Sequence, residues 1–197
     1  SDKMKFIRDE DGLEVYLDLE NGKEVFLGRS NIAGDTMHEI TDTLLAICRE
    51  AHALDAEMPS IRESGDEERA FAVFSRLQDS LFAEAERIAS GPGRKMALAH
   101  FTAGLVLRVL VRQAEAEHYF RRANELQPGV ASTLLELVRC LGELGKNDEA
   151  LPFAREAVAI SPDSPAALGN LAMCLIQSGE REEALKYLDQ AIELDPD

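Results

Sequence analysis

The sequence predicts a mainly α-helical protein, in which a stack of helix pairs follows a small antiparallel β meander and two longer helices. Two observations lead to this fold class. Over residues 97–197 a set of small and apolar residues recurs three times at a fixed period of 34. Before it, an alternation of apolar and polar residues gives way to apolar residues spaced by three and four. The predicted parts are a meander over 1–34, a helical segment covering the first repeat over 35–96, and repeats over 97–130, 131–164 and 165–197.

The first 34 residues have the pattern of β structure. Residues 13–19 alternate apolar and polar side chains, and residues 24–28 can pair with them across Asn21-Gly22, a strong hairpin signal. Residues 5–8 add a third antiparallel strand. A small meander is marginal in water unless something covers its apolar face. We expect the next helix to supply that cover.

A first long helix is predicted from Asp35 to about Met58. Thr36 and Glu39 form a capping box at its start, and Pro59 is expected to end it. One apolar stripe runs along it, formed by Met37, Ile40, Leu44, Ile47, Ala51 and Leu54.

A second long helix is predicted to begin with the capping pattern from Ser64 to Glu67 and to continue to about Ser90. Residues 91–93, Gly-Pro-Gly, then break the chain. The large apolar residues of this helix are Phe71, Phe74, Leu77, Leu81, Phe82 and Ile88. We read it as one helix that covers the open end of the first repeat, with a divergent helix pair as the alternative.

The repeats themselves are predicted to be pairs of short amphipathic helices, each pair closed by a proline that cannot continue the helix. The positions that recur are Ala116, Phe120, Ala123 and Pro128, then Ala150, Ala154, Ala157 and Pro162, then Ala184, Leu188, Ala191 and Pro196. The expected helices span about 95–111, 114–126, 132–144, 147–160, 165–178 and 181–194.

This pattern resembles the tetratricopeptide repeat (TPR) family, with three repeats. The first large position of each unit holds His100, Leu134 or Leu168 in place of the family's Trp. The resemblance implies a right-handed α-α superhelix, the TPR solenoid, whose first helices line a concave groove.

The resemblance also implies a binding site in that groove. Carried over by register, its partner-binding residues are Leu98, Phe101, Leu105, Arg108, Leu135, Arg139, Asn170, Met173 and Gln177. Some family members use a clamp for two carboxylates. Asn170 stands at its asparagine position, but Thr102 and Glu136 stand at the equivalents, so that clamp is expected to be absent.

Composition excludes several classes of function. The formal net charge of −16 argues against a nucleic-acid binder, and no apolar run approaches the length of a membrane span. Cys48 and His52 lie four residues apart, but no second such pair completes a metal site. No cluster of nucleophile, base and orienting group predicts an enzyme or a cofactor. Three cysteines among apolar residues indicate buried, reduced thiols in a cytoplasmic protein.

The sequence therefore predicts a non-catalytic protein-protein interaction module, an adaptor, scaffold or chaperone that binds a protein or peptide segment in the groove. Alternatively, the amino-terminal helices, or the meander, fill the groove themselves. A second alternative is a self-assembling homo-oligomer that joins through an uncapped carboxyl-terminal repeat, at Leu171, Leu175, Leu185 and Leu188. Small acidic proteins with three such repeats also resemble the chaperones of bacterial secretion systems, from which the meander departs.

Overall fold

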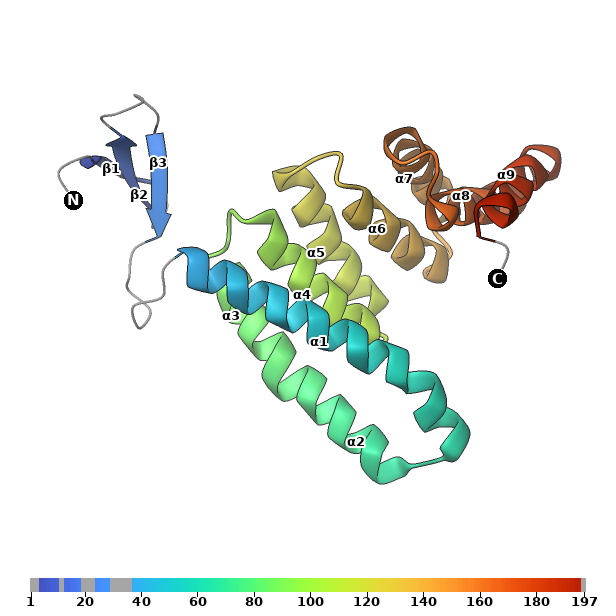
Figure 1. Ribbon diagram of the computed structural model, residues 1–197, viewed down its shortest axis with the longest axis horizontal. Coiled ribbons are helices and arrows are strands. Elements are labelled where there is room, and N and C mark those ends of the chain that lie inside the picture. The colour runs from blue at the N-terminus through green and yellow to red at the C-terminus, as the bar shows by residue number, and fades with distance from the viewer. Residues whose placement is uncertain (1–3, 11–12, 19–23, 29–36, 196–197) are drawn as a thin grey trace.

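The computed structural model describes residues 4–10, 13–18, 24–28 and 37–195 of the 197-residue chain (Figure 1). Several sequence predictions fall outside this part. They concern the turn at Asn21-Gly22, the helix start at Asp35 and Thr36, and the closing Pro196.

Three short strands precede the helices. They are β1 (Met4–Glu10), β2 (Leu13–Asp18) and β3 (Glu24–Gly28), paired antiparallel in the order β1-β2-β3. The register of β1 against β2 shifts between Phe6 and Arg8, where β1 carries one residue more than its partner.

The first helix, α1 (Met37–Ser64), is longer than predicted. Pro59 lies inside it and does not end it. A proline inside a helix costs ~3 kcal/mol, but burying a residue such as Ile61 contributes about 1.5–3 kcal/mol, and Ile61 is 6% exposed. The helix ends instead at Gly65, whose φ of 65° is accessible to glycine.

The second long helix consists of α2 (Glu67–Ser75), η1 (Arg76–Phe82) and α3 (Ala83–Ser90), which follow one another without a break. Its cap is Asp66 and not Ser64. The Asp66 carboxylate accepts a hydrogen bond from the backbone N–H of Arg69 at 2.9 Å.

The middle segment, η1, is a π-helix, and the spacing of the buried residues explains it. These residues are four apart throughout: Val73, Leu77, Leu81, Ala85 and Ala89. On an α-helix of 3.6 residues per turn such a row rotates by about 40° at each step. Wider π turns reduce that drift and keep the row against α1 and the first repeat. Phe71 and Phe74, two of the apolar residues of this helix, lie outside the row and are 72% and 52% exposed.

The repeat helices begin and end within two residues of the predicted bounds. They are α4 (Ala97–Val109), α5 (Gln113–Leu126), α6 (Ala131–Glu143), α7 (Asn147–Ile160), α8 (Pro165–Gln177) and α9 (Arg181–Leu194). Ser164 caps α8, accepting a hydrogen bond from the backbone N–H of Ala167 at 3.3 Å.

Two features of repeat one show how the repeated positions determine packing. A Cβ added at Gly104 of α4 would lie 2.9 Å from the ring of Phe120 in α5, so only glycine allows the two helices to approach this closely. The turn between these helices has Val111 at φ 62°, where repeats two and three have Gly145 and Gly179 at φ 71° and 85°.

The predicted fold class needs one correction, which concerns the packing of the meander against the helices. We expected the apolar stripe of α1 to cover the sheet, which would make the sheet a layer of the fold. Instead Ile40 and Leu44 of α1 pack with Ile88 of α3 and Ala99 of α4. Over residues 37–195, whose side chains the structure describes, the hydrophobic core is formed by helices alone, and the fold class is corrected to an α-helical solenoid.

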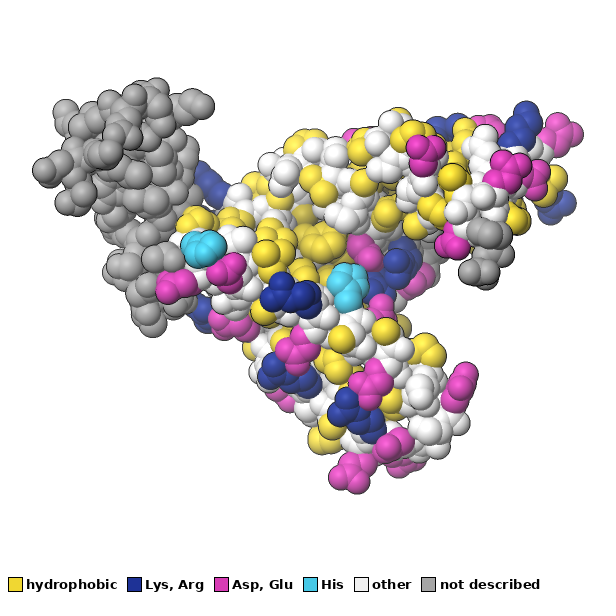
Figure 2. All heavy atoms as spheres, viewed as in Figure 1, with side chains coloured by type: hydrophobic (Ala, Val, Ile, Leu, Met, Phe, Trp, Pro, Cys, Tyr) yellow, Lys and Arg dark blue, Asp and Glu magenta, His cyan; other side chains and the backbone are white. Residues whose placement is uncertain are grey.

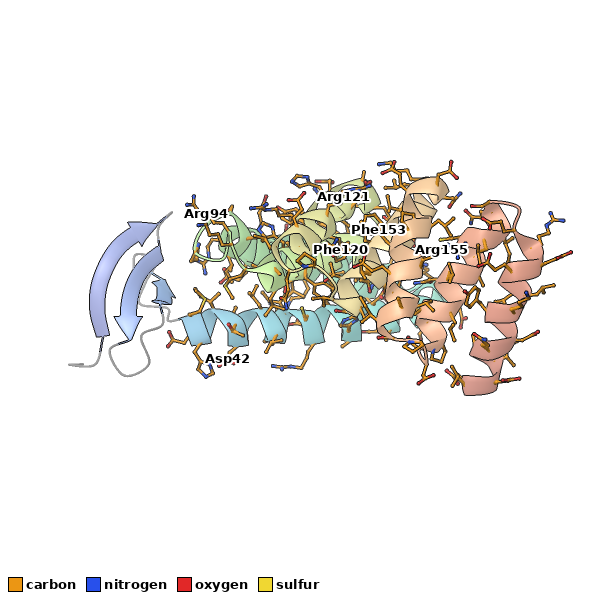
Figure 3. The ribbon with its side chains drawn as sticks, turned by 90° about the horizontal axis from the view of Figure 1, so that it is seen from above. Asp42, Arg94, Phe120, Arg121, Phe153 and Arg155 are labelled. Atoms are coloured by element: carbon orange, nitrogen blue, oxygen red, sulfur yellow. The ribbon has the colours of Figure 1, made fainter. Side chains whose placement is uncertain are left out.

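The helix pairs α4/α5, α6/α7 and α8/α9 follow one another along the molecule, and α1 lies across α4 (Figure 1). Arginines of the second helices join neighbouring units. Arg121 pairs with Glu149 at 2.5 Å, and 34 residues later Arg155 pairs with Glu183 at 2.9 Å. Arg121 and Arg155 lie in succession along the stack (Figure 3).

Candidate functional site

In repeat one, the predicted groove is filled by the protein itself. Leu105, Arg108 and Val109 of α4 are only 0%, 8% and 5% exposed, because α1 packs against α4 there. Leu98 and Phe101, nearer the start of α4, are half-buried. The groove positions of this repeat are therefore largely closed to a partner.

Two polar contacts hold α1 in this position. The Cys48 Sγ of α1 and the Thr102 Oγ1 of α4 lie 3.2 Å apart, within hydrogen-bond distance. Burial raises the pKa of the Cys48 thiol, which keeps it protonated near neutral pH. One helical turn and a half further on, Arg108 Nη2 donates a hydrogen bond to Asp55 Oδ2 at 2.7 Å.

Arg108 also connects α1 to repeat two. Its Nε lies 2.8 Å from Glu136 Oε2 of α6, in the geometry of an ion pair without a directed hydrogen bond. Burial alone lowers the pKa of Arg108, but Asp55 and Glu136 outweigh it and the pKa is raised. Glu136 reaches Arg139 as well, at 3.5 Å. We call these four residues, Asp55, Arg108, Glu136 and Arg139, the charge chain.

Beyond the charge chain the groove is open. A cavity of about 290 Å³ lies between α6, the start of α7 and α8. Four of the predicted site residues line it: Arg139, Asn170, Met173 and Gln177. Met173 is 52% exposed and forms, with Val138 and Cys174, the apolar part of the lining.

The polar lining of this cavity has unused hydrogen-bonding capacity. Within the described residues, the amides of Asn170 and Gln177 have no hydrogen-bond partner, and the buried Oδ1 of Asn147 has none either. Arg139 supplies a half-exposed cation, and its ion pair to Glu136 is long, at 3.5 Å. Glu143 accepts a hydrogen bond from Gln113 and is thereby engaged. This combination suits the amide groups of an extended peptide beside an apolar side chain.

The remaining predicted positions lie apart from this cavity. Leu98 and Phe101 line a smaller cavity of about 150 Å³ between the starts of α4 and α6. Leu135 is half-buried against the cluster that contains Leu134 and Ala157. The structure thus brings four predicted residues together and separates the other five.

The predicted contact surface at the last repeat is partly wrong. Leu171 and Leu175 are 1% and 0% exposed, because α8 packs them into the core. Leu188 is half-buried, and Leu185 is 58% exposed.

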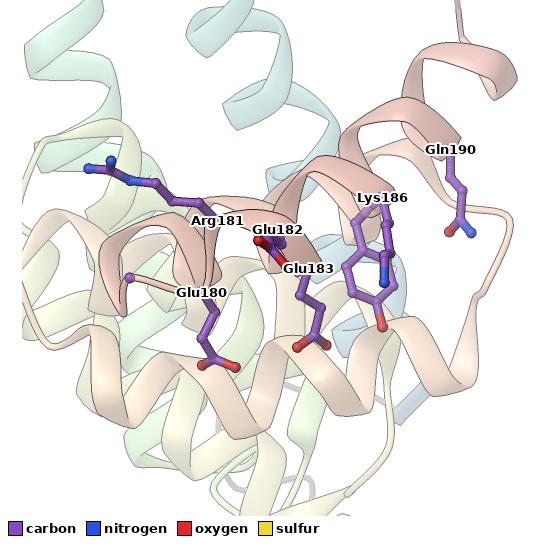
Figure 4. A pocket seen from close by; sticks show the side chains of 8 residues that line it. Glu180, Arg181, Glu182, Glu183, Lys186 and Gln190 are labelled. Atoms are coloured by element: carbon purple, nitrogen blue, oxygen red, sulfur yellow. The ribbon is translucent and has the colours of Figure 1, made fainter.

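Sequence reasoning missed a hollow of about 870 Å³ along the start of α9 (Figure 4). Its lining includes Glu180, Glu183 and Lys186, and Arg155 of α7 lies 3.8 Å from Glu180 and 2.9 Å from Glu183. The period of 34 could have indicated this ion pair, since Arg121 and Glu149 precede it in register. The hollow is open and its charges neutralise one another, so we consider the cavity at Met173 the better candidate.

Within the described ranges, no group of three or more His, Cys, Asp and Glu side chains is placed to hold a metal ion. His52, four residues after Cys48, is exposed on α1. The ring Nε2 of His100 lies 2.9 Å from the carbonyl oxygen of Arg94, and burial lowers the pKa of this histidine. None of the helices of residues 37–195 has the length and apolar composition to span a bilayer.

The comparisons with known proteins agree with this architecture. Residues 142–197 match the sequence model of the family described as tetratricopeptide repeat. Over residues 142–197 the chain therefore matches the tetratricopeptide repeat family, and its stacked helix pairs have the fold of tetratricopeptide repeat proteins. None of the curated proteins matches the sequence.

Solved structures of the same fold include YrrB, described as a TPR protein with an unusual peptide-binding site. It is 23% identical, the match covers 72% of this chain and 75% of that one, and the TM-score is 0.57. A MamA structure is 18% identical over 81% of this chain and 94% of that one, with a TM-score of 0.54. MamA 41-end from Desulfovibrio magneticus RS-1 is 17% identical over 76% of each chain, with a TM-score of 0.56. At these identities the likeness is one of fold.

Proposed function

We propose that this protein is a non-catalytic interaction module, an adaptor or chaperone that binds an extended segment of a partner protein between α6 and α8. The observation that carries the proposal is the cavity in which Arg139, Asn170, Met173 and Gln177 meet. Met173 would receive an apolar side chain of the segment, and the unpartnered amides would bind its backbone. Three free thiols, Cys48, Cys140 and Cys174, support a cytoplasmic location.

The groove available to the partner is shorter than the repeats alone would give. Because α1 covers Leu105, Arg108 and Val109, the segment would run over repeats two and three and meet α1 near Asp55. The internal helix would thus set one end of the binding site. This reading combines the two alternatives left open by the sequence, a partner segment and an internal occupant.

The test is selection of displayed random 12-residue peptides on the wild-type protein, followed by affinity measurements on variants. We expect the selected peptides to bind Met173→Glu at least ~10-fold more weakly, a loss of about 1.4 kcal/mol, because the charge replaces the apolar contact. Met173 is 52% exposed, so the substitution leaves the fold intact. Leu135→Glu is a poorer choice, because Leu135 packs against the core.

A matched control is Ile160→Glu, at a 43% exposed apolar residue of α7 that does not line the cavity. It should leave peptide affinity unchanged. Equal affinity of the selected peptides for wild type and Met173→Glu would contradict the proposed site.

A further inference from the structure

The most exposed large apolar side chain among the described residues is that of Phe71, at 72%, and Phe74 follows it at 52%. Residues three apart are neighbours on one face of a helix, so the two rings form a ridge along α2. We call this pair the phenylalanine ridge. Aromatic side chains are enriched at protein interfaces because each buries a large area when a partner covers it.

The exposure of the ridge follows from how the long helix is wound. Val73 and Leu77, at 2% exposure each, begin the row of buried residues that runs through η1 into α3. That row holds α2 against α1 and keeps Phe71 and Phe74 on the outer side. The ridge is therefore a fixed surface, and no rearrangement of the side chains alone would bury it. π-Helical segments are frequently found at functional sites.

The charges around the ridge are acidic. Both arginines of this region are held on the side of α1: Arg69 pairs with Glu57 at 2.6 Å, and Arg76 pairs with Glu50 at 2.6 Å. Glu67 and Glu68 lie one turn before Phe71, are exposed, and have no ion-pair partner in the described part of the chain. A partner that binds the ridge would therefore contact two aromatic rings flanked by carboxylates that have no ion-pair partner in the described part of the chain.

From this arrangement we infer that the phenylalanine ridge is a docking surface for a basic amphipathic segment of another protein. Apolar side chains of the segment would cover Phe71 and Phe74, and its Lys or Arg residues would pair with Glu67 and Glu68 or lie over the rings. A second copy of this chain fits poorly, because symmetric contact would place these carboxylates against their own copies. The surface lies on α2, away from the cavity at Met173, so it adds a second site to the proposed function.

The inference is tested with two synthetic 14-residue amphipathic peptides, one of Leu and Lys and one of Leu and Glu, titrated against the full chain by fluorescence anisotropy. We expect the Lys peptide to bind the wild type and the Glu peptide not to bind. Phe71→Gln/Phe74→Gln should weaken binding of the Lys peptide at least tenfold. Glu67→Gln/Glu68→Gln should weaken it about threefold and reduce its dependence on salt.

The matched control is Leu185→Gln/Ile192→Gln, which removes two apolar side chains of α9 that are 58% and 61% exposed. This control should leave the affinity for the Lys peptide within twofold of the wild type. Met173→Glu should also leave it within twofold, which would show that the ridge is a different site from the groove cavity. Equal weakening in the α9 control would show that the peptide binds exposed apolar side chains without preference for the phenylalanine ridge, and would overturn the inference. It would also be overturned if Phe71→Gln/Phe74→Gln impaired binding only to anionic phospholipid vesicles and not to the peptide.

Discussion

Val111 has a backbone conformation that is unfavourable for a valine. Its φ of 62° is in the left-handed region, where a β-branched side chain is strained, yet its side chain is 65% exposed and contributes little packing. The amino-acid sequence itself contains this departure, since Gly145 and Gly179 occupy the same position in the other repeats.

We expect Val111→Asn to stabilise the protein by ~1 kcal/mol, because asparagine tolerates this region and the strain of a side chain there is of order 1–2 kcal/mol. Urea unfolding followed by circular dichroism measures the change. The control Ile160→Asn, at an exposed helical position, should lower the stability slightly. A lower midpoint for Val111→Asn would contradict the assigned strain.

Between helices, the buried carboxylate of Glu117 is the main polar connection. It accepts hydrogen bonds from Arg121 at 2.8 Å and from Lys146 at 2.7 Å, and so joins α5 to the turn before α7. Burial alone raises the pKa of Glu117, but the two hydrogen bonds outweigh it and the pKa is lowered below its ordinary value of 4.5. A carboxylate with a lowered pKa stabilises the fold above its unfolded-state pKa.

Glu117→Gln should therefore cost about 1–3 kcal/mol at neutral pH, since each bond to a charged group contributes about 1.5–3 kcal/mol and the partners are partly exposed. As the pH falls below about 4.5 towards the folded-state pKa, the wild type gains a proton and the difference shrinks. Unfolding at a series of pH values measures it. Glu125→Gln, which removes an exposed pair with Arg122, should cost under about 0.5 kcal/mol. A difference that grew on acidification would refute the assignment.

At the scale of the secondary-structure elements, the sequence predicted most of the helices, because periodicity and prolines are local signals. It did not show which apolar residues of the second long helix are buried, because two local spacings compete there. Phe71 and Phe74 fit a spacing of three and four, whereas Val73 and Leu77 belong to a row spaced by four. Only the contact with α1 and the π-helical winding decide between them, and neither is visible in a single segment.

For the whole molecule, the charge chain is the contact that sequence reasoning had no means of finding. Arg108 and Asp55 are 53 residues apart, and the register of the repeats assigned Arg108 to an open groove. The four predicted residues that meet in the cavity belong to repeats two and three, where no described part of the chain packs over the groove. Register predicts a surface, but only tertiary structure shows what covers it.

We expect Arg108→Met to destabilise the protein by about 3–5 kcal/mol, because it leaves the buried charge of Glu136 with only its longer ion pair to Arg139 at 3.5 Å. The Glu136 side chain is only 10% exposed, whereas that of Asp55 is 36% exposed. Adding Glu136→Gln to Arg108→Met should recover at least ~1 kcal/mol, and Asp55→Asn alone should cost about 1 kcal/mol or less. Urea unfolding of all variants gives the coupling energy, and strict additivity would show that the chain does not act as a unit.

The arginine–glutamate pairs that recur along the second helices determine how such a chain can be lengthened by duplication. Each arginine reaches a glutamate 28 positions further on, Arg121 to Glu149 and Arg155 to Glu183. An in-frame duplication of residues 131–164 would carry one acceptor and one donor with it. The original Arg155 would face the copied Glu149, and the copied Arg155 would face Glu183, so no ion pair would be lost. A gene encoding this stack can therefore lengthen by whole units without first evolving a new junction.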